Sequence, residues 1–397
     1  MSNYFPSQVV SDNEKLSLDY GLKIGKAIES EWFKRDSGTN RFASNQNNFH
    51  KLRLYARGEQ AIQKYKDELS INGDLSYLNL DWKPVPIIPK FVDIVVNGIS
   101  ERTFDIKAYT QDPYGVDKRT KYMENILADM RSQELNEFAA EAFGVNLQSS
   151  NVNPLPDNEE ELQLHMQLNY KQAVEIAEEQ AINVLLDGNR YELIRKKVNY
   201  DLCVLGIGCV KNSFNKAEGV KVEYVDPANV VYSYTEDPYF EDIYYFGEIK
   251  TIPINEIVKE FPHLTEQELK KLHNQGHQTT GFYNRSLAES VNQDKNQIQV
   301  LYFNYKTYMN EVYKTKETAT GGDKIIVKDD QFNPPTELLE ERFGKLSKQI
   351  EVLFEGAMVL GTKQMLRWQL ANNMMRPKSD YTKVKMNYSI VAPRMYK

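Results

Sequence analysis

The amino-acid sequence predicts an α+β fold, with a helix-rich first half and a β-rich region after about residue 290. Apolar residues recur at helical spacing between residues 49 and 204, whereas they alternate with polar residues in later segments such as 298–313 and 349–360. Hydrophobic residues make up 41% of the 397 residues and charged residues 26%. This composition is that of a globular protein with a sizeable core.

Helices dominate the predicted first half. Residues 1–49 are expected to form a polar N-terminal arm with little core of its own, apart from the stretch around Ile24, Ile28 and Trp32. Glycines and prolines mark where the later helices begin and end. Those helices are predicted at residues 49–69, 81–99, 117–143 and 162–186, with a further helix running to about Val204.

Strands are predicted where apolar and polar residues alternate. Two short helices are expected after Pro253, the second with a capping box of Thr265 and Glu268, and another helix near residues 336–348. The β-rich part after about residue 290 is expected to be a separate module. The predicted strands span residues 103–109, 220–224, 230–231, 243–250, 298–313, 324–328, 349–360 and 383–391.

Charge is distributed unevenly along the chain, which carries 49 Lys and Arg against 56 Asp and Glu, a net charge of −7. Residues 132–180 hold ten acidic residues and one lysine, whereas residues 357–397 hold eight basic residues and one aspartate. Such blocks can bind different partners or neighbouring copies of the chain, or they can simply be solvated faces. The acidic balance excludes a uniformly basic nucleic-acid-binding protein.

The composition also bears on the location of the protein. No apolar run approaches the about 18 residues that a membrane-spanning helix requires, and the first residues lack the features of a secretory signal. Cys203 and Cys209 are too few for a disulfide framework, so a reducing compartment is expected. The 25 tyrosines, against 3 tryptophans, are typical of protein interfaces.

Glycine motifs give no support to nucleotide binding. The stretch GLKIGKA at 21–27 is one residue shorter than a phosphate-binding loop and ends in alanine instead of a metal-binding hydroxyl, so it is predicted to be a helix with two glycines. The stretch GIGCVK at 206–211 has lysine in place of the third glycine of a dinucleotide motif. It is predicted to be a bulge or a helix-to-strand turn.

Metal-binding and catalytic patterns are weak as well. His273 and His277 have the spacing of a zinc-binding helix, but Gly276 disfavours that helix and no glutamate lies between them. The stretch TEDPYFED at 235–242 holds four carboxylates that could bind magnesium or act as acid and base, although a solvated loop is the simpler interpretation. No catalytic, cofactor-binding or metal-binding residue is assigned, and no cofactor is expected.

Several longer segments carry a resemblance to a known family. They are RLYARGEQAI at 53–62, IIPKFVDIVVNGISER at 87–102, DLCVLGIGCVKNSF at 201–214, KVEYVDPANVVYSYTEDPYFEDIYYFGE at 221–248, QVLYFNYKTY at 299–308, EVLFEGAMVLGTKQML at 351–366 and APRMY at 392–396. Together they resemble the portal proteins of tailed bacteriophages, most closely the portals of crAss-like phages. The resemblance covers residues 50–397.

The resemblance implies the phage portal fold, in which identical subunits, usually twelve, form a ring at one capsid vertex. Residues 1–49 would be the N-terminal arm, followed by the first part of the wing at 50–250, a stem segment at 251–290 and a β-rich clip at 291–397. The second stem helix, the channel-lining tunnel loop and the crown would lie beyond Lys397. The ring would be the conduit for DNA packaging and ejection.

The resemblance also implies partners. They are further copies of the chain, the major capsid protein, the terminase motor, tail adaptor or connector proteins, and double-stranded DNA that passes without sequence specificity. Assembly would occur in the host cytoplasm and the protein would reside in the virion, with no membrane involved. Basic residues of the clip are expected to contact a partner or a neighbouring clip, the alternative being a solvated surface. These residues are Lys363, Arg367, Arg376, Lys378, Lys383 and Lys385.

Two other functions remain open beside this expectation of a structural protein that is not an enzyme. The carboxylates from Glu236 to Asp242 could belong to a metal-dependent hydrolase, which would bind magnesium or manganese as a monomer. The chain could also be another virion scaffold or adaptor protein, which would assemble without a central channel.

Overall fold

The computed structural model consists of two compact units. Met1–Glu101 and Glu192–Lys397 form the first, here called the sheet unit, and Arg102–Tyr191 form the second, the helical unit. The sheet unit combines helices with antiparallel sheets, so the fold is mixed α and β. The structure describes residues 4–34, 40–59, 62–70, 81, 85–101, 106–110, 112–144, 152, 155–168, 170–215, 219–272, 297–317, 323–328, 343–377 and 379–393.

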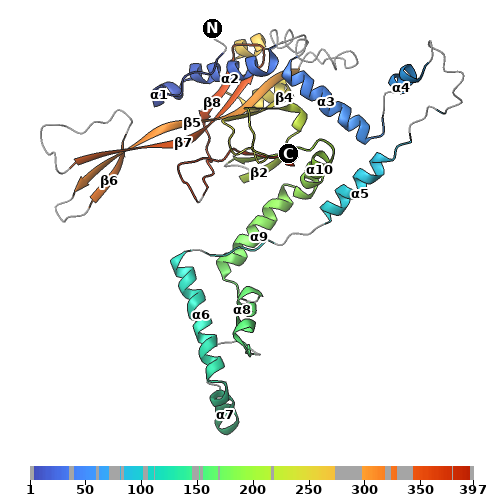
Figure 1. The fold of residues 1–397 in the computed structure, drawn as a ribbon. Coiled ribbons are helices and arrows are strands. Elements are labelled where there is room, and N and C mark those ends of the chain that lie inside the picture. Colours follow the sequence, from blue (N-terminus) through green and yellow to red (C-terminus); the bar gives the residue numbers. More distant parts are fainter. Residues whose placement is uncertain are drawn as a thin grey trace. The chain divides into compact units, whose positions relative to one another are not determined.

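Two antiparallel sheets form the centre of the sheet unit (Figure 1). The larger has the strand order β3–β4–β5–β7–β8, with β6 paired to β5, and the smaller has the order β2–β1–β9. The larger sheet contains β3 (Val230–Tyr232), β4 (Tyr245–Pro253), β5 (Gln297–Glu317), β6 (Asp323–Lys328), β7 (Phe343–Val359) and β8 (Met365–Leu370). The smaller contains β1 (Gly208–Asn215), β2 (Gly219–Tyr224) and β9 (Tyr388–Val391).

Strand β5 is 21 residues long and pairs with β4, β6 and β7. Both of its faces are buried along residues 298–305. Leu301, Phe303 and Tyr305 belong to one apolar cluster, whereas Val300 belongs to another that contains different residues of β4 and β7. A strand buried on both faces is apolar at most positions, which explains the dense apolar and aromatic pattern of this segment.

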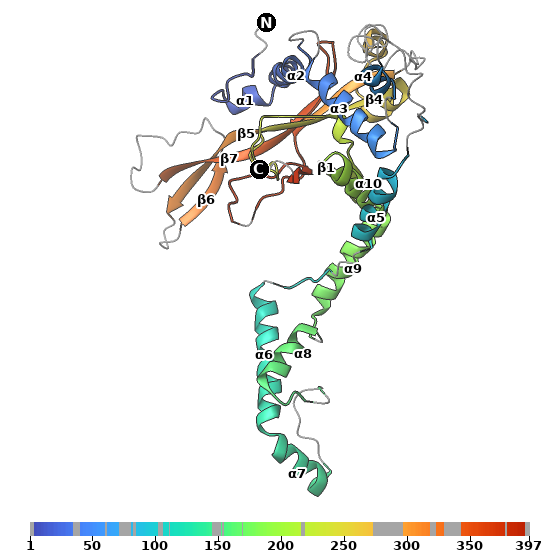
Figure 2. The ribbon, with the colours of Figure 1, turned by 45° about the vertical axis from the view of Figure 1, so that its right-hand side comes forward.

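Helix α2 (Leu18–Phe33) packs against β7 and β8 of the larger sheet (Figures 1 and 2). Ile24, Ile28 and Trp32 have no exposed surface, and the Trp32 indole N–H donates to the hydroxyl of Tyr245 at 3.0 Å. These residues are therefore part of the main core rather than of a separate N-terminal arm. Their segment is rich in polar residues because only one side of the helix meets the sheet.

Two glycines allow α2 to lie close to the sheet. A Cβ atom on Gly21 would stand 2.5 Å from the ring of Trp368, and one on Gly25 would stand 2.8 Å from the sulfur of Met358. The predicted helix with two glycines is therefore confirmed. Its glycines provide room for side chains of the sheet and do not surround a phosphate.

The sheets join segments that the expected wing, stem and clip boundaries would separate. Residues 245–253 of β4 pair with residues 297–305 of β5. The larger sheet therefore joins strands that lie on the two sides of the expected stem segment at 251–290. Residues 208–211 of β1 pair with residues 388–391 of β9. The β-rich region after residue 290 is thus not a separate module. Alternating residues reveal a strand, but they do not reveal its partner.

The helical unit contains more breaks than the sequence suggests. The helix predicted at 117–143 is divided at Ser132, and the helix predicted at 162–186 is divided before Gln172, where a capping box with Glu175 starts a new helix. The unit contains α6 (Pro113–Arg131), α7 (Gln133–Phe143), α8 (Glu159–Leu168) and α9 (Ala173–Gly188). Among its described residues, the buried apolar cluster consists of Ile126, Leu162 and Met166.

The strand predicted at 103–109 is absent from its described part, residues 106–109. Here the backbone N–H groups of Ala108 and Thr110 donate to the carboxylates of Glu179 (3.0 Å) and Glu175 (2.8 Å). Side chains of α9 therefore satisfy backbone groups that a neighbouring strand would otherwise bond.

The remaining elements agree with the sequence in type more than in length. The helix predicted at 49–69 is interrupted at Gly58, where φ is +78°. The capping box of Thr265 and Glu268 is confirmed. Residues 343–348 belong to a strand and not to the helix predicted near 336–348. The other elements are α1 (Asp12–Lys15), α3 (Arg41–Ala56), α4 (Ile62–Leu69), α5 (Ile88–Ser100), α10 (Tyr191–Val204), η1 (Pro227–Asn229) and α11 (Ile254–Glu260).

None of the helices in the described part of the chain is both long enough and apolar enough to span a membrane.

Replacing Gly21 with alanine tests the close packing of α2. The new Cβ would overlap the Trp368 ring, so we expect the free energy of unfolding to fall by about 2 kcal/mol in urea denaturation. Gly98→Ala in α5 is the matched control, because nothing lies within 4 Å of its Cβ position. The control should stabilise the protein by about 0.5–1 kcal/mol through helix propensity. Equal stabilisation by both substitutions would contradict this packing.

Candidate functional site

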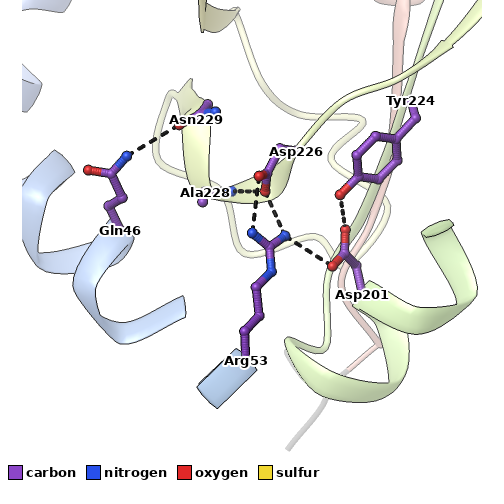
Figure 3. Close-up of polar contacts among 7 residues, drawn as sticks. All are labelled: Gln46, Arg53, Asp201, Tyr224, Asp226, Ala228 and Asn229. Atoms are coloured by element: carbon purple, nitrogen blue, oxygen red, sulfur yellow. Dashed lines mark hydrogen bonds and ion pairs between the residues drawn. The ribbon is translucent and has the colours of Figure 1, made fainter. Parts of the chain in front are cut away.

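A cluster of charged residues around Arg53 connects three elements of the sheet unit (Figure 3). Arg53 lies near the end of α3, and its guanidinium donates to both carboxylate oxygens of Asp226, at 2.7 and 3.0 Å. It also donates to Asp201 of α10 at 3.1 Å. The hydroxyl of Tyr224, the last residue of β2, donates to the other oxygen of Asp201. We call these four residues the Arg53 cluster.

Local structure fixes the position of Asp226. Its carboxylate accepts a hydrogen bond from the backbone N–H of Ala228 at 3.0 Å and so caps the short helix η1. A second contact joins the same turn to α3, because the amide of Gln46 donates to the side chain of Asn229 at 3.4 Å. The turn between β2 and β3 is thus held by two side chains on the same face of α3, about two helical turns apart (Figure 3).

Burial and ion pairing shift the pKa values of Arg53 and Asp201 in opposite directions. Burial alone would lower the pKa of Arg53, but its bonds to Asp226 and Asp201 raise it above the ordinary value. Burial raises the pKa of Asp201, and the hydrogen bond from Tyr224 and the charge of Arg53 offset this only in part. Burial and the neighbouring Asp201 raise the pKa of Tyr224. Tyr224 therefore stays protonated and donates to Asp201.

A cavity of about 610 Å³ lies beside the cluster. Three further cations line it, Arg57 of the turn after α3 and Lys196 and Lys197 of α10, together with the carboxylate of Asp93 in α5. Its lining residues include no histidine, cysteine or serine. Since the guanidinium of Arg53 already bonds two carboxylates, the cluster holds α3, α10 and the turn after β2 together.

A second group of buried charges lies between the two sheets. Lys211 of β1 has its ammonium 5.4 Å from the ring centre of Tyr388 and 5.6 Å from that of Tyr302. Burial and the charge of Lys250 lower the pKa of Lys211, while burial raises the pKa of Glu248 in β4. These carboxylate and ammonium groups lie where the smaller sheet meets the larger, so they connect the two sheets.

Two of the basic residues predicted to bind a partner are used within the chain. The guanidinium of Arg367 in β8 pairs with Glu260 at 3.0 Å and lies over the ring of Phe261. Arg376 donates to the backbone carbonyls of Tyr381 (2.7 Å) and Glu351 (3.1 Å). Arg376 therefore fixes the connection that leads from β8 to β9.

The other predicted basic residues are exposed where the structure describes them. Lys363 lies in the turn between β7 and β8, and Lys383 and Lys385 precede β9. Lys378 lies outside the described residues. Arg376, Lys383 and Lys385 share one connection, whereas Lys363 lies in a different loop.

The carboxylates of residues 235–242 stabilise their own loop. Asp242 accepts hydrogen bonds from the hydroxyl of Thr235 and from the N–H of Glu236, and Asp237 accepts from two N–H groups of the turn that follows it. In the described ranges, no three His, Cys, Asp or Glu side chains gather so that they could share a metal ion. The loop interpretation is therefore favoured over a magnesium site.

Three smaller predictions can also be compared with the structure. Gly206 has a φ of +79° between α10 and β1, as expected for a helix-to-strand turn. Cys209 is buried in the core and Cys203 is partly buried. His273 and His277 lie outside the described residues.

Comparison with known proteins gives no relative from which a role could be transferred. No protein-family model matches the chain, and no curated protein matches it significantly.

Sequence reasoning did not find the Arg53 cluster, whose members are 148 and 173 residues away from Arg53. Two signals were available. Asp201 interrupts the apolar run around residues 198–207, and Asp226 precedes Pro227 in a turn that needs a cap. A buried aspartate requires a partner, but the sequence does not show which arginine supplies it.

Removing the guanidinium should destabilise the protein strongly. In Arg53→Ala, the side chain of Asp201, which is only 3% exposed, would lose its cation. We expect the free energy of unfolding in urea to fall by about 3 kcal/mol. Arg53→Lys should recover only part of the loss, because an ammonium cannot bond both carboxylates in the same planar geometry.

Arg57→Ala is the matched control for this substitution. Arg57 is exposed and belongs to the same turn of the chain, so its removal should change the free energy of unfolding by no more than about 0.5 kcal/mol. A loss in Arg53→Ala no larger than in this control would show that the cluster contributes nothing specific.

Proposed function

We propose that this chain is a portal protein that forms a ring at a capsid vertex, through which double-stranded DNA enters and leaves. The ring would also be the docking platform for the packaging motor and then for tail adaptor proteins. The observation that carries the proposal is the large exposed apolar surface of a unit that has little core of its own.

The helical unit is the clearest case of an incomplete surface. Its described residues bury one small cluster, whereas Leu135, Phe138 and Phe143 of α7 are 68%, 64% and 74% exposed and Val184 of α9 is 71% exposed. Several exposed apolar side chains on one helix, as on α7, mark an interaction surface. Neighbouring copies in a ring would cover such surfaces.

The segments that carry the resemblance to portals also support the proposal. Residues 53–62 contain Arg53, residues 201–214 contain Asp201, and residues 221–248 contain both Tyr224 and Asp226. Within the segments 299–308 and 351–366, residues 300–308 of β5 pair with residues 351–359 of β7. The shared segments are therefore the ones that build the framework of the sheet unit.

Electron microscopy of the purified full chain tests the proposal directly. We expect negatively stained particles to be rings with a central opening, and mass photometry to show one large assembly. A protein that stays monomeric at micromolar concentration would contradict the proposal, and so would an assembly without an opening. In the latter case a scaffold or adaptor protein would be favoured.

Polar substitutions on α7 should prevent assembly without unfolding the subunit. In Leu135→Ser/Phe138→Ser, two exposed apolar side chains are removed, so the concentration required for half assembly should rise at least tenfold in mass photometry. Val9→Ser is the control, since Val9 is 96% exposed but belongs to the N-terminal segment and not to α7. Unchanged assembly of the double variant would exclude α7 from the subunit interface.

Reversing the charge of three lysines tests the expected docking region. Lys378→Glu/Lys383→Glu/Lys385→Glu should weaken binding of the tail adaptor at least tenfold in a pull-down while rings still form, because the docking charge is removed. Reversal of the exposed Lys51, Lys90 and Lys259 is the matched control. Equal adaptor binding by both triple variants would reject this role for the three lysines.

A further inference from the structure

The larger sheet has an open edge where β3 ends. Strand β3 pairs with β4 only through residues 230–232, and its first residue, Val230, is paired with Glu248. The backbone N–H of Ser233 donates to the carbonyl of Tyr245, so every second residue from Tyr245 onward directs its backbone groups toward β3. Ile249 and Thr251 continue this series beyond Val230, where β3 begins. We call residues 249–252 the β4 edge.

The β4 edge lines a cavity of about 400 Å³ that contains a buried acceptor without a hydrogen-bond donor, the side-chain oxygen of Gln299. Gln299 is 8% exposed and Glu248 is 6% exposed. The side-chain Oε1 of Gln299 accepts no hydrogen bond, whereas Oε2 of Glu248 is paired with the ammonium of Lys250 at 3.4 Å. Buried acceptors normally have donors, so this cavity is suited to a chain segment that brings donors with it.

Strand β6 is an edge strand that could pair with an open edge of this kind. It pairs with β5 alone, and its other edge has no partner among the described strands. The N–H of Lys306 donates to Tyr244, so even-numbered residues of β5 direct their backbone groups toward β4 and β6. Their partners are the even-numbered residues of β6, which leaves the N–H groups of Ile325 and Val327 facing outward.

The exposed side chains of β6 are unusual for an edge strand. Ile325 and Val327 are 62% and 65% exposed, and Lys324 beside them is also exposed. An apolar edge strand left open is a template for pairing with another strand. Lys324 supplies a donor of the kind that the side-chain oxygen of Gln299 lacks.

The two edges cannot meet within one chain. Lys250 faces Val300 and Ile326 faces Lys314, so the pairing sites are 14 residues apart on β5. At about 3.3 Å per residue this separation is about 45 Å. A contact between them therefore requires two copies.

We propose that β6 of one copy adds as a strand to the β4 edge of a second copy and so extends the larger sheet across the subunit boundary. The inference rests on the proposed function only in taking a second copy as the occupant. Backbone hydrogen bonds to Ile249 and Thr251 would provide affinity, and the cavity beside Gln299 would receive a donor side chain.

Proline substitutions test both sides of this contact. Val327→Pro removes an outward N–H and leaves the bonds to β5, and Thr251→Pro does the same on the β4 edge. Each should raise the concentration for half assembly at least tenfold in mass photometry, with an unchanged circular dichroism spectrum. Val327→Thr and Thr251→Val keep the N–H groups and should assemble within about twofold of the unmodified protein.

A labelled peptide of residues 322–329 (GDKIIVKD) tests the site without assembly. It should bind the full chain saturably in fluorescence anisotropy, at least tenfold more weakly to Thr251→Pro, and a scrambled peptide should not bind. Rings that form equally in all variants, with no peptide binding, would overturn this inference and leave the ring itself intact. Loss of assembly in Val327→Pro alone would indicate that β6 pairs with another β6, which also overturns it.

Discussion

Strand β5 is the element on which the sheet unit depends. It pairs with β7 over 17 positions and, on its other side, with β4 and then β6. Apolar clusters cover both of its faces between residues 298 and 305, and one of them includes α2 from the start of the chain. Elements far apart in the sequence, from α2 near the start of the chain to β8 near its end, therefore depend on this one strand. A defect in β5 would affect α2, β4 and β8 together.

The types of element were largely predictable from the sequence, whereas their partners were not. Alternation identified residues 298–313 as a strand, and their density of apolar residues agrees with burial on both faces. Nothing in the segment indicated that its neighbours begin at residues 245 and 343. Helix breaks such as that at Ser132 were missed, because the apolar spacing continues through them while the capping does not.

The candidate site shows the same division between local and distant information. The turn at Asp226 was expected from Asp-Pro, but its pairing with Arg53 depends on α3 lying against η1, a contact between segments 173 residues apart. The basic residues before β9 were found from composition alone. Composition could not distinguish Arg376, which bonds backbone carbonyls, from Lys383 and Lys385, which are exposed.

The Arg53 cluster lies where the chain leaves and re-enters the sheet unit. Helix α5 ends at Ser100 and α10 follows the helical unit, and Arg195 and Asn199 of α10 bond to Ile99 and Ser100 at 3.1 and 3.2 Å. Arg53 joins α10 to α3 beside this point. Buried ion pairs add little net stability compared with apolar packing, but they disfavour alternative arrangements because each mispaired charge is costly. The cluster therefore acts mainly to define how α10 packs against α3, which fixes the geometry of the sheet unit where the helical unit is connected to it.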